Sequence, residues 1–266
     1  MTTIRELSNL KGRRALLTGA TGGLGKVMAD TLAELGADLV LIDRPGTDFE
    51  TLKFALTDRW GSKVEHHSCD LEFQEQRSEL MEWVKSSDQG LNILVNNAAF
   101  VGTSDLQGWG APFELQSVET WRRALEVNLT AIFDLCQGLT PLLRAGKGAS
   151  IINVASIYGS HGPDWSLYEG TSMSNPAAYG ASKGGLLQLT RWLAATIAPE
   201  VRVNAISPGG IFRNQAEVFV QRYTASVPLG RMAAEEDFRG VTAYLASDMS
   251  KYVTGQNFTL DGGWGI

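Results

Sequence analysis

Short apolar segments alternate with helical segments along the whole chain, and this alternation restricts the fold more than any other feature. The segments that we predict as strands cover residues 14–18, 38–43, 63–67, 91–95, 150–154, 201–206 and 257–260. Helical periodicity fills the intervals, over residues 23–35, 48–60, 72–86, 117–144, 176–198, 214–224 and 235–246. Continuous apolar strands separated by helices indicate a parallel sheet covered on both faces. We therefore predict an α/β fold, one doubly wound Rossmann-type domain over residues 1–266 with a parallel seven-stranded sheet.

The composition argues against several classes of function. A net charge of −6 disfavours nucleic acid and anionic membranes as partners. No apolar stretch approaches the roughly 18 residues that a membrane span needs, and the first residues lack the layout of a signal peptide. Cys69 and Cys136 are the only cysteines, which argues against a disulfide framework and a thiolate metal site. We expect a cytoplasmic protein that holds no metal and binds neither nucleic acid nor membrane.

The first predicted strand runs into the turn Thr18-Gly19-Ala20-Thr21-Gly22-Gly23-Leu24-Gly25, and a helix follows at once. Gly19 would allow a tight turn, Gly23 would let the backbone approach a pyrophosphate, and Gly25 would allow close packing of helix on strand. The free N–H groups and partial positive charge of a helix N-terminus suit a phosphate. The turn therefore predicts a dinucleotide-binding site.

Asp43, at the end of the second predicted strand, indicates which dinucleotide binds. An acid roughly 20 residues beyond the glycines can accept hydrogen bonds from both adenosine ribose hydroxyls. The same carboxylate would repel the 2′-phosphate of NADP, so we favour NAD as the cofactor. Arg44 could pair with that phosphate, and NADP therefore remains the alternative.

Tyr179 and Lys183 lie four residues apart in the predicted helix 176–198, so their side chains share one face. An ammonium beside a phenol favours the ionised phenol, which would allow general acid/base chemistry. The spacing alone also fits an ordinary pair on a solvated helix face. Among the six tyrosines, however, only Tyr179 has a lysine four residues further on.

These features together resemble the compact, single-domain branch of the short-chain dehydrogenase/reductase family, over about residues 12 to 264. The matching motifs are Thr18-Gly19-x-x-x-Gly23-x-Gly25, Asp70-Leu71, Asn96-Asn97-Ala98-Ala99, the series Asn128, Ser156, Tyr179 and Lys183, and Pro208-Gly209. Ala99 replaces the family's usual glycine. After Pro208, the chain has Phe212-Arg213-Asn214 where the family often has a threonine that touches the nicotinamide amide.

The resemblance implies an oxidoreductase that interconverts a secondary alcohol and a ketone by hydride transfer with NAD. Tyr179 would exchange a proton with the substrate oxygen, and Lys183 would lower the pKa of Tyr179 and hold the nicotinamide ribose. Ser156 would hydrogen-bond the substrate oxygen, and Asn128 would hold a water in a proton relay. The implied cofactor contacts are Gly19, Thr21, Gly23, Leu24, Gly25, Asp43, Asp70, Leu71, Asn97, Ala98, Tyr179, Lys183, Pro208, Gly209 and Ile211.

Three segments, 100–116, 159–175 and 209–225, are specific to this chain and are expected to form the substrate loops. Their mixture of aromatic and polar residues suits a sugar, sugar phosphate, sugar acid or polyol, and Arg213 could pair with a phosphate or carboxylate. The segment 227–264 resembles family members that act on sugars. The alternatives are an acyl or steroid-like substrate, a nucleotide-sugar epimerase or dehydratase of the extended branch, and a catalytically silent NAD-binding regulator. The resemblance also implies a homotetramer or homodimer, with helices 117–144 and 176–198 pairing between subunits.

Overall fold

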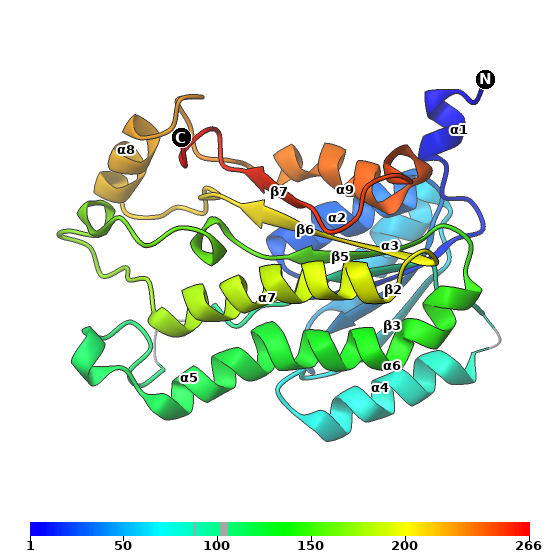
Figure 1. Ribbon diagram of the computed structural model, residues 1–266, viewed down its shortest axis with the longest axis horizontal. Helices are drawn as coiled ribbons and strands as arrows, with labels where there is room; N and C mark the ends of the chain where they lie inside the picture. The colour runs from blue at the N-terminus through cyan, green and yellow to red at the C-terminus, as the bar shows by residue number, and fades with distance from the viewer. Residues whose placement is uncertain (88, 102–105) are drawn as a thin grey trace.

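The computed structural model describes residues 1–87, 89–101 and 106–266, and in these residues the strands form a single parallel sheet (Figure 1). The strands are β1 (Arg14–Thr18), β2 (Asp38–Asp43), β3 (Val64–Ser68), β4 (Ile93–Asn96), β5 (Ala149–Val154), β6 (Val201–Pro208) and β7 (Asn257–Leu260). Their order is β3-β2-β1-β4-β5-β6-β7, and every neighbouring pair is parallel. The predicted seven-stranded, doubly wound sheet is confirmed.

Helices connect the strands and cover both faces of the sheet. They are α1 (Ile4–Ser8), α2 (Gly23–Glu34), α3 (Phe49–Trp60), α4 (Gln74–Ser86), α5 (Val118–Leu125), α6 (Ala131–Ala145), α7 (Ala177–Thr196), α8 (Glu217–Ala225) and α9 (Arg239–Ala246). Short 3₁₀ helices are η1 (Phe113–Leu115), η3 (Ile157–Gly159), η4 (Trp165–Leu167), η5 (Glu235–Phe238) and η6 (Asp248–Ser250). No described helix has the length and apolar character that crossing a membrane requires. The sequence did not predict α1, which starts with a capping box between Thr3 and Glu6.

The predicted helix 117–144 differs from a regular α-helix at its centre. Between α5 and α6 the backbone forms the π-helical segment η2 (Glu126–Thr130). A π segment changes which residues face inward, and such segments often occur at functional sites. Here the inward residue is Asn128, whose side chain is fully buried. Trp121 of α5 and Phe133 of α6 are exposed.

Alternating strand residues build two cores, one on each face of the sheet. Leu16 packs in one core with Leu80 of α4 and Leu186 of α7. Its neighbour Leu17 packs in the other core, with Met28 of α2. Helices α4, α6 and α7 therefore cover one face, and α2, α3 and α9 cover the other.

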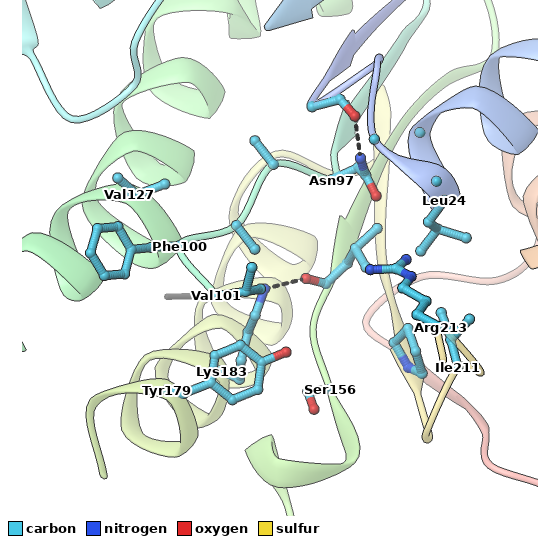
Figure 2. Close-up of a pocket in the computed structure, with 18 of the residues that line it drawn as sticks. Leu24, Asn97, Phe100, Val101, Val127, Ser156, Tyr179, Lys183, Ile211 and Arg213 are labelled. Carbon is cyan, nitrogen blue, oxygen red and sulfur yellow. Dashed lines mark hydrogen bonds between the residues drawn. The ribbon is translucent and has the colours of Figure 1, made fainter. Parts of the chain in front are cut away.

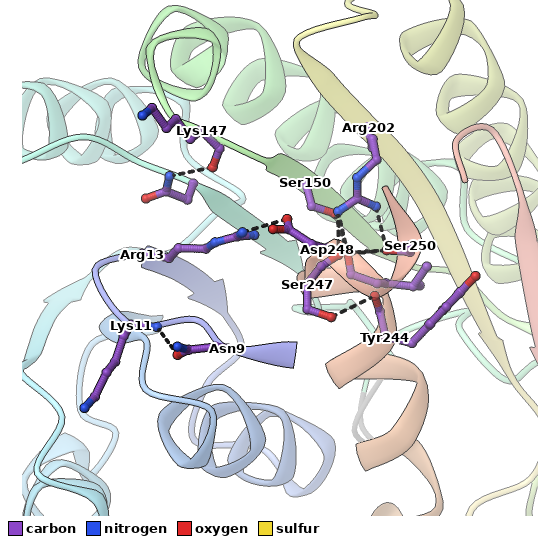
Figure 3. Close-up of polar contacts among 12 residues, drawn as sticks. Asn9, Lys11, Arg13, Lys147, Ser150, Arg202, Tyr244, Ser247, Asp248 and Ser250 are labelled. Carbon is purple, nitrogen blue, oxygen red and sulfur yellow. Dashed lines mark hydrogen bonds and ion pairs between the residues drawn. The ribbon is translucent and has the colours of Figure 1, made fainter. Parts of the chain in front are cut away.

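Arginines close the amino edge of the sheet (Figure 3). Arg202 at the start of β6 donates to Ser250 Oγ at 2.8 Å and to the Leu245 carbonyl at 3.0 Å. Burial lowers the pKa of Arg202 to about 10. Arg13 forms a 2.6 Å ion pair with Asp248. These contacts tie the segment after α9 to the strand starts and leave the carboxyl edge open for ligands.

Candidate active site

A cavity of about 830 Å³ opens at the carboxyl ends of the central strands. It extends across the point between β1 and β4 where the strand order reverses, which is where doubly wound sheets bind their ligands. Every residue predicted to contact the cofactor borders this cavity, as do Ser156 and parts of all three predicted substrate loops. Residues 102–105 of the first loop lie outside the described residues. Figure 2 shows the central part of the cavity.

The glycine turn forms one wall of the cavity, and its geometry requires glycine. Gly19 has a φ of +65°, and a Cβ there would lie 2.8 Å from the Cα of Ala98. A Cβ on Gly25 would overlap the carbonyl oxygen of Gly19, so the predicted close packing of α2 on the turn is present. The side-chain amide of Asn97 donates at 3.0 Å to the carbonyls of Thr18 and Gly19. This arrangement keeps the cradle at the start of α2 open, which fits a bound dinucleotide.

Asp43 is tied to the same turn. Its Oδ2 accepts hydrogen bonds from the Thr21 backbone N–H at 2.9 Å and the Thr21 hydroxyl at 2.7 Å. Its Oδ1 accepts from the backbone N–H of Arg44 at 2.8 Å, while the Arg44 side chain is exposed. A carboxylate offers about four acceptor positions, and three of those on Asp43 are already occupied. A ribose that donates from two hydroxyls would therefore have to displace one present donor, the Thr21 hydroxyl.

Tyr179 and Lys183 lie on α7 and reach the cavity together (Figure 2). The Lys183 side chain is 1% exposed, and its Nζ donates to the Val154 carbonyl at 2.7 Å. This Nζ lies 5.8 Å from the centroid of the Tyr179 ring. Burial lowers the pKa of Lys183 to about 8. The helix spacing therefore brings the two side chains together beside the end of β5.

The pKa of Tyr179 is raised, mainly because the phenol is removed from water. The nearby Ser156 hydroxyl and the positive charge of Arg213 lower the pKa of Tyr179 without overcoming burial. The expectation that Lys183 makes this phenol easier to ionise is therefore wrong for this structure. The physical reason is that desolvation outweighs the charges around the ring, and the Lys183 ammonium binds a carbonyl instead.

Asn128 lies beneath the cavity and does not border it. Its Oδ1 accepts from the Phe100 N–H at 2.6 Å, and its Nδ2 donates to the Phe100 carbonyl at 3.3 Å and to Ser182 Oγ at 3.1 Å. The side chain therefore joins the segment after β4 to α7. The side-chain amide of Asn128 is bonded to the protein itself, and the water that the resemblance implies for this residue stays a prediction.

The segment 159–175 forms the substrate-side wall of the cavity together with α8. Tyr158 and Tyr168 both border the cavity, and their hydroxyl oxygens are 2.6 Å apart. Arg222 of α8 donates to the carbonyls of Ser166 at 3.0 Å and Glu169 at 2.5 Å. The segments 159–175 and 209–225, which the sequence predicts as separate loops, are thus joined into one structural unit.

Phe219 and Tyr223 of α8, which lie in the predicted substrate segment 209–225, and Met232 border the cavity, although none of the three was singled out from the sequence. The Tyr223 hydroxyl accepts from the N–H of Gly210 at 2.6 Å. Phe219 and Tyr223 have i,i+4 spacing, which signals an apolar helix face. Only the fold shows that this face packs beside the loop after β6.

The fold and the site define an oxidoreductase that works with a bound dinucleotide. Ser156 and Tyr179 meet at the cavity that also contains the glycine turn, so a substrate oxygen and a cofactor can lie side by side there.

The chain belongs to the short-chain dehydrogenase/reductase family. Residues 19–265 match the family model described as enoyl-(acyl carrier protein) reductase. A tropinone reductase homologue of Arabidopsis thaliana is 33% identical over 269 residues, which are 97% of this chain and 94% of that protein. The protein is therefore an oxidoreductase acting on CH–OH groups, with a fold that binds NAD(P).

Solved structures agree with this assignment. A gluconate 5-dehydrogenase from Burkholderia cenocepacia, in complex with NADP and tartrate, superposes with a TM-score of 0.85 at 27% identity, covering 98% of each chain. A xylitol dehydrogenase bound to NAD⁺ superposes with a TM-score of 0.83 at 28% identity, covering 96% of this chain and 99% of that one.

Proposed function

We propose that this protein is an NAD-dependent dehydrogenase or reductase that interconverts a secondary alcohol and a ketone on a sugar, sugar phosphate, sugar acid or polyol. The observation that carries the proposal is that Ser156 and Tyr179 border the same cavity, whose substrate-side wall presents the hydroxyls of Tyr158 and Tyr168. Ser156 and Tyr179 can bind the reacting oxygen, and Tyr158 and Tyr168 can bind further hydroxyls of the same substrate.

In this proposal each active-site residue has a defined role. Ser156 donates a hydrogen bond to the substrate oxygen as negative charge develops on it. Tyr179 exchanges the proton with that oxygen. Lys183, held by the Val154 carbonyl, places its ammonium at the nicotinamide ribose. The bound nicotinamide cofactor supplies hydride transfer.

The proposed role of Asn128 is to position other groups. Its side chain fixes the backbone of Phe100, which borders the cavity, and the hydroxyl of Ser182, which precedes the cavity residue Lys183. Asn128 therefore sets the distance between the segment after β4 and the helix that carries Tyr179.

The proposed preference for NAD rests on Asp43. Its carboxylate is fixed beside the turn by Thr21, at the cavity wall where the adenosine ribose of a dinucleotide would lie. A 2′-phosphate there would face a fixed negative charge. The related structures include complexes with NADP and with NAD⁺, so they do not distinguish between the two cofactors. The proposed preference for NAD therefore depends on the carboxylate of Asp43.

The proposed carbohydrate-like substrate is supported by the lining of the cavity and by the relatives. The hydroxyls of Tyr158 and Tyr168 can pair with substrate hydroxyls, and the ring of Phe219 offers an apolar surface. The gluconate and xylitol enzymes named above act on a sugar acid and a polyol.

A substrate panel tests this proposal directly. NADH formation would be measured with sugars, sugar phosphates, sugar acids and polyols, and 3-hydroxyacyl thioesters and hydroxysteroids would serve as comparison substrates. Turnover confined to the carbohydrate group supports the proposal. Turnover only with an acyl or steroid substrate contradicts it, and cofactor binding without turnover on any member would favour the silent regulator.

We further propose a cytoplasmic homotetramer built through the long helices. Trp121 of α5, Phe133 of α6 and Trp192 of α7 are 37%, 42% and 55% exposed. Large aromatic side chains at such exposure are typical of surfaces that become buried in an assembly. Light scattering of the purified protein should give four times the chain mass, and replacing Trp192 by Glu should lower that mass. A monomer at micromolar concentration would contradict the proposal.

A further inference from the structure

An ion pair lies directly over the glycine turn. Arg213, in the loop after β6, donates from Nε to Oε1 of Glu235 in η5 at 3.0 Å. A Cβ on Gly23 would lie 2.7 Å from that Oε1 and 3.5 Å from Nη2 of Arg213. Gly23 therefore leaves room for these two charged side chains at the first turn of α2. Figure 2 shows Arg213 beside Leu24 and Ile211, at the glycine-turn side of the cavity.

The backbone that carries Arg213 is held in a compact turn. The side chain of Gln215 accepts from the Arg213 N–H at 2.7 Å and donates to the Ile211 carbonyl at 2.7 Å. Asn214, between them, has a φ of +58°, a left-handed conformation that asparagine tolerates better than most residues. The hydrogen bonds of Gln215 thus fix the backbone position from which the Arg213 side chain reaches the glycine turn.

The charges at this place constrain what the pair can do. The N-terminus of α2 attracts anions, and a dinucleotide places its diphosphate there. Glu235 alone would oppose the binding of a diphosphate, because two negative charges a few ångströms apart repel each other. Arg213 compensates that carboxylate. Within the described residues, the two Nη groups of Arg213 make no hydrogen bond, so they remain free to donate.

We propose that Arg213 binds the diphosphate of NAD(P), with Glu235 as the positioning residue that holds the guanidinium over Gly23. The inference rests on the NAD(P) binding of the family. The side chains of Arg213 and Glu235 are 53% and 25% exposed, so their pairing is weak and the guanidinium can also bind a stronger anion. Bonds from a guanidinium to phosphate are short and charge-assisted. The chain thereby replaces a nicotinamide-side threonine, frequent in the family, by a phosphate ligand.

Calorimetric titration tests this without measuring turnover. The purified protein and its Arg213→Gln variant would be titrated with NAD, with ADP and with adenosine. Loss of a charge-assisted contact costs on the order of 1.5–3 kcal/mol, so NAD and ADP should each bind about 10- to 100-fold more weakly to the variant. Adenosine, which has no phosphate, should bind equally to both proteins.

Arg59→Gln is the matched control. The Arg59 side chain is 64% exposed, pairs with Asp30 at 3.4 Å and does not border the cavity, so the control removes the same charge at another place. It should leave all three affinities unchanged. A loss confined to NAD would place Arg213 at the nicotinamide half and overturn the proposal. Equal loss for adenosine, or no loss for ADP, would also overturn it.

A double variant tests the role of Glu235. In Arg213→Gln the carboxylate of Glu235 faces the diphosphate without compensation. Adding Glu235→Gln should therefore restore part of the lost ADP affinity, about 2- to 10-fold, since the repulsion of two unit charges 4 Å apart in water is about 1 kcal/mol, or roughly 5-fold. A merely structural pair would give no such recovery. An ADP affinity that stays at the single-variant value would refute the proposed position of Glu235 beside the phosphates.

Discussion

The Nζ of Lys183 donates a 2.7 Å hydrogen bond to the carbonyl oxygen of Val154, and this bond joins α7 to the end of β5 beneath the cavity. A lysine with 1% exposure in this position has lost nearly all of its hydration. The structure offers one carbonyl in exchange, which is why the pKa of Lys183 falls to about 8.

Lys183 should make the stability of the protein depend on pH in the alkaline range. Its pKa is about 8 in the folded protein against 10.5 as the ordinary value, so between these values the unfolded chain binds more protons. The free energy of unfolding of the wild type, measured relative to Lys183→Met, should therefore rise from pH 8 to pH 10.5 by roughly 3 kcal/mol. Urea denaturation of both proteins at several pH values measures this difference. A difference that stays flat with pH would show that Lys183 titrates as in water.

Asn128→Ala should destabilise the fold. The change removes three side-chain hydrogen bonds and leaves the Phe100 N–H without its acceptor, a loss of about 1–3 kcal/mol in the free energy of unfolding. Ser182→Ala removes only one of these bonds and should cost less. Equal denaturation midpoints for wild type and Asn128→Ala would contradict the account of Asn128 as the link between the β4 segment and α7.

Asp43→Asn should change the cofactor preference. The amide keeps the size of the side chain and one acceptor oxygen but removes the charge that faces a 2′-phosphate. We expect NAD to bind several-fold more weakly and NADP to bind more tightly, with the ratio of the two dissociation constants moving by about tenfold or more. Arg44→Gln is the comparison variant and should weaken NADP alone. If Asp43→Asn leaves the affinity for NADP unchanged, the carboxylate does not set the preference.

Tyr168→Phe should affect the substrate and spare the cofactor. The variant removes the hydroxyl that pairs with Tyr158 at 2.6 Å but keeps the ring against Phe219. We expect KM for the best substrate of the panel to rise about 3- to 10-fold, corresponding to a hydrogen bond of about 1 kcal/mol, with the NAD dissociation constant unchanged. Tyr252→Phe, at a fully exposed site, is the control. A rise in the NAD dissociation constant instead of KM would show that Tyr168 contacts the cofactor and not the substrate.

Local sequence patterns were sufficient to predict the seven strands, the helices between them and the glycine turn, while most of the cofactor contacts were implied by the family resemblance. Short apolar runs mark buried parallel strands, and Gly19 and Gly25 occur where a side chain would collide with backbone. Tyr179 and Lys183 share a face because helix periodicity is regular. These features depend on neighbours in the chain, so a single sequence contains them.

Contacts between distant segments could not be predicted in the same way. The π segment at Asn128 has no period that distinguishes it from the α-helix around it. Nothing near Glu235 in the chain indicates that it lies over Gly23, because the contact depends on how the loop after β6 folds back. The raised pKa of Tyr179 depends on burial by several segments at once, which a spacing of four residues does not reveal.

Turnover of Tyr179→Phe is the decisive measurement for the proposed role of Tyr179 as the residue that transfers the proton in an NAD-dependent oxidation. The variant lacks only the hydroxyl, so it should fold, bind NAD with the affinity of the wild type and lose several orders of magnitude in kcat. The measurement is the initial rate of NADH formation with the best substrate, together with the NAD dissociation constant of both proteins. A kcat close to that of the wild type would contradict the account.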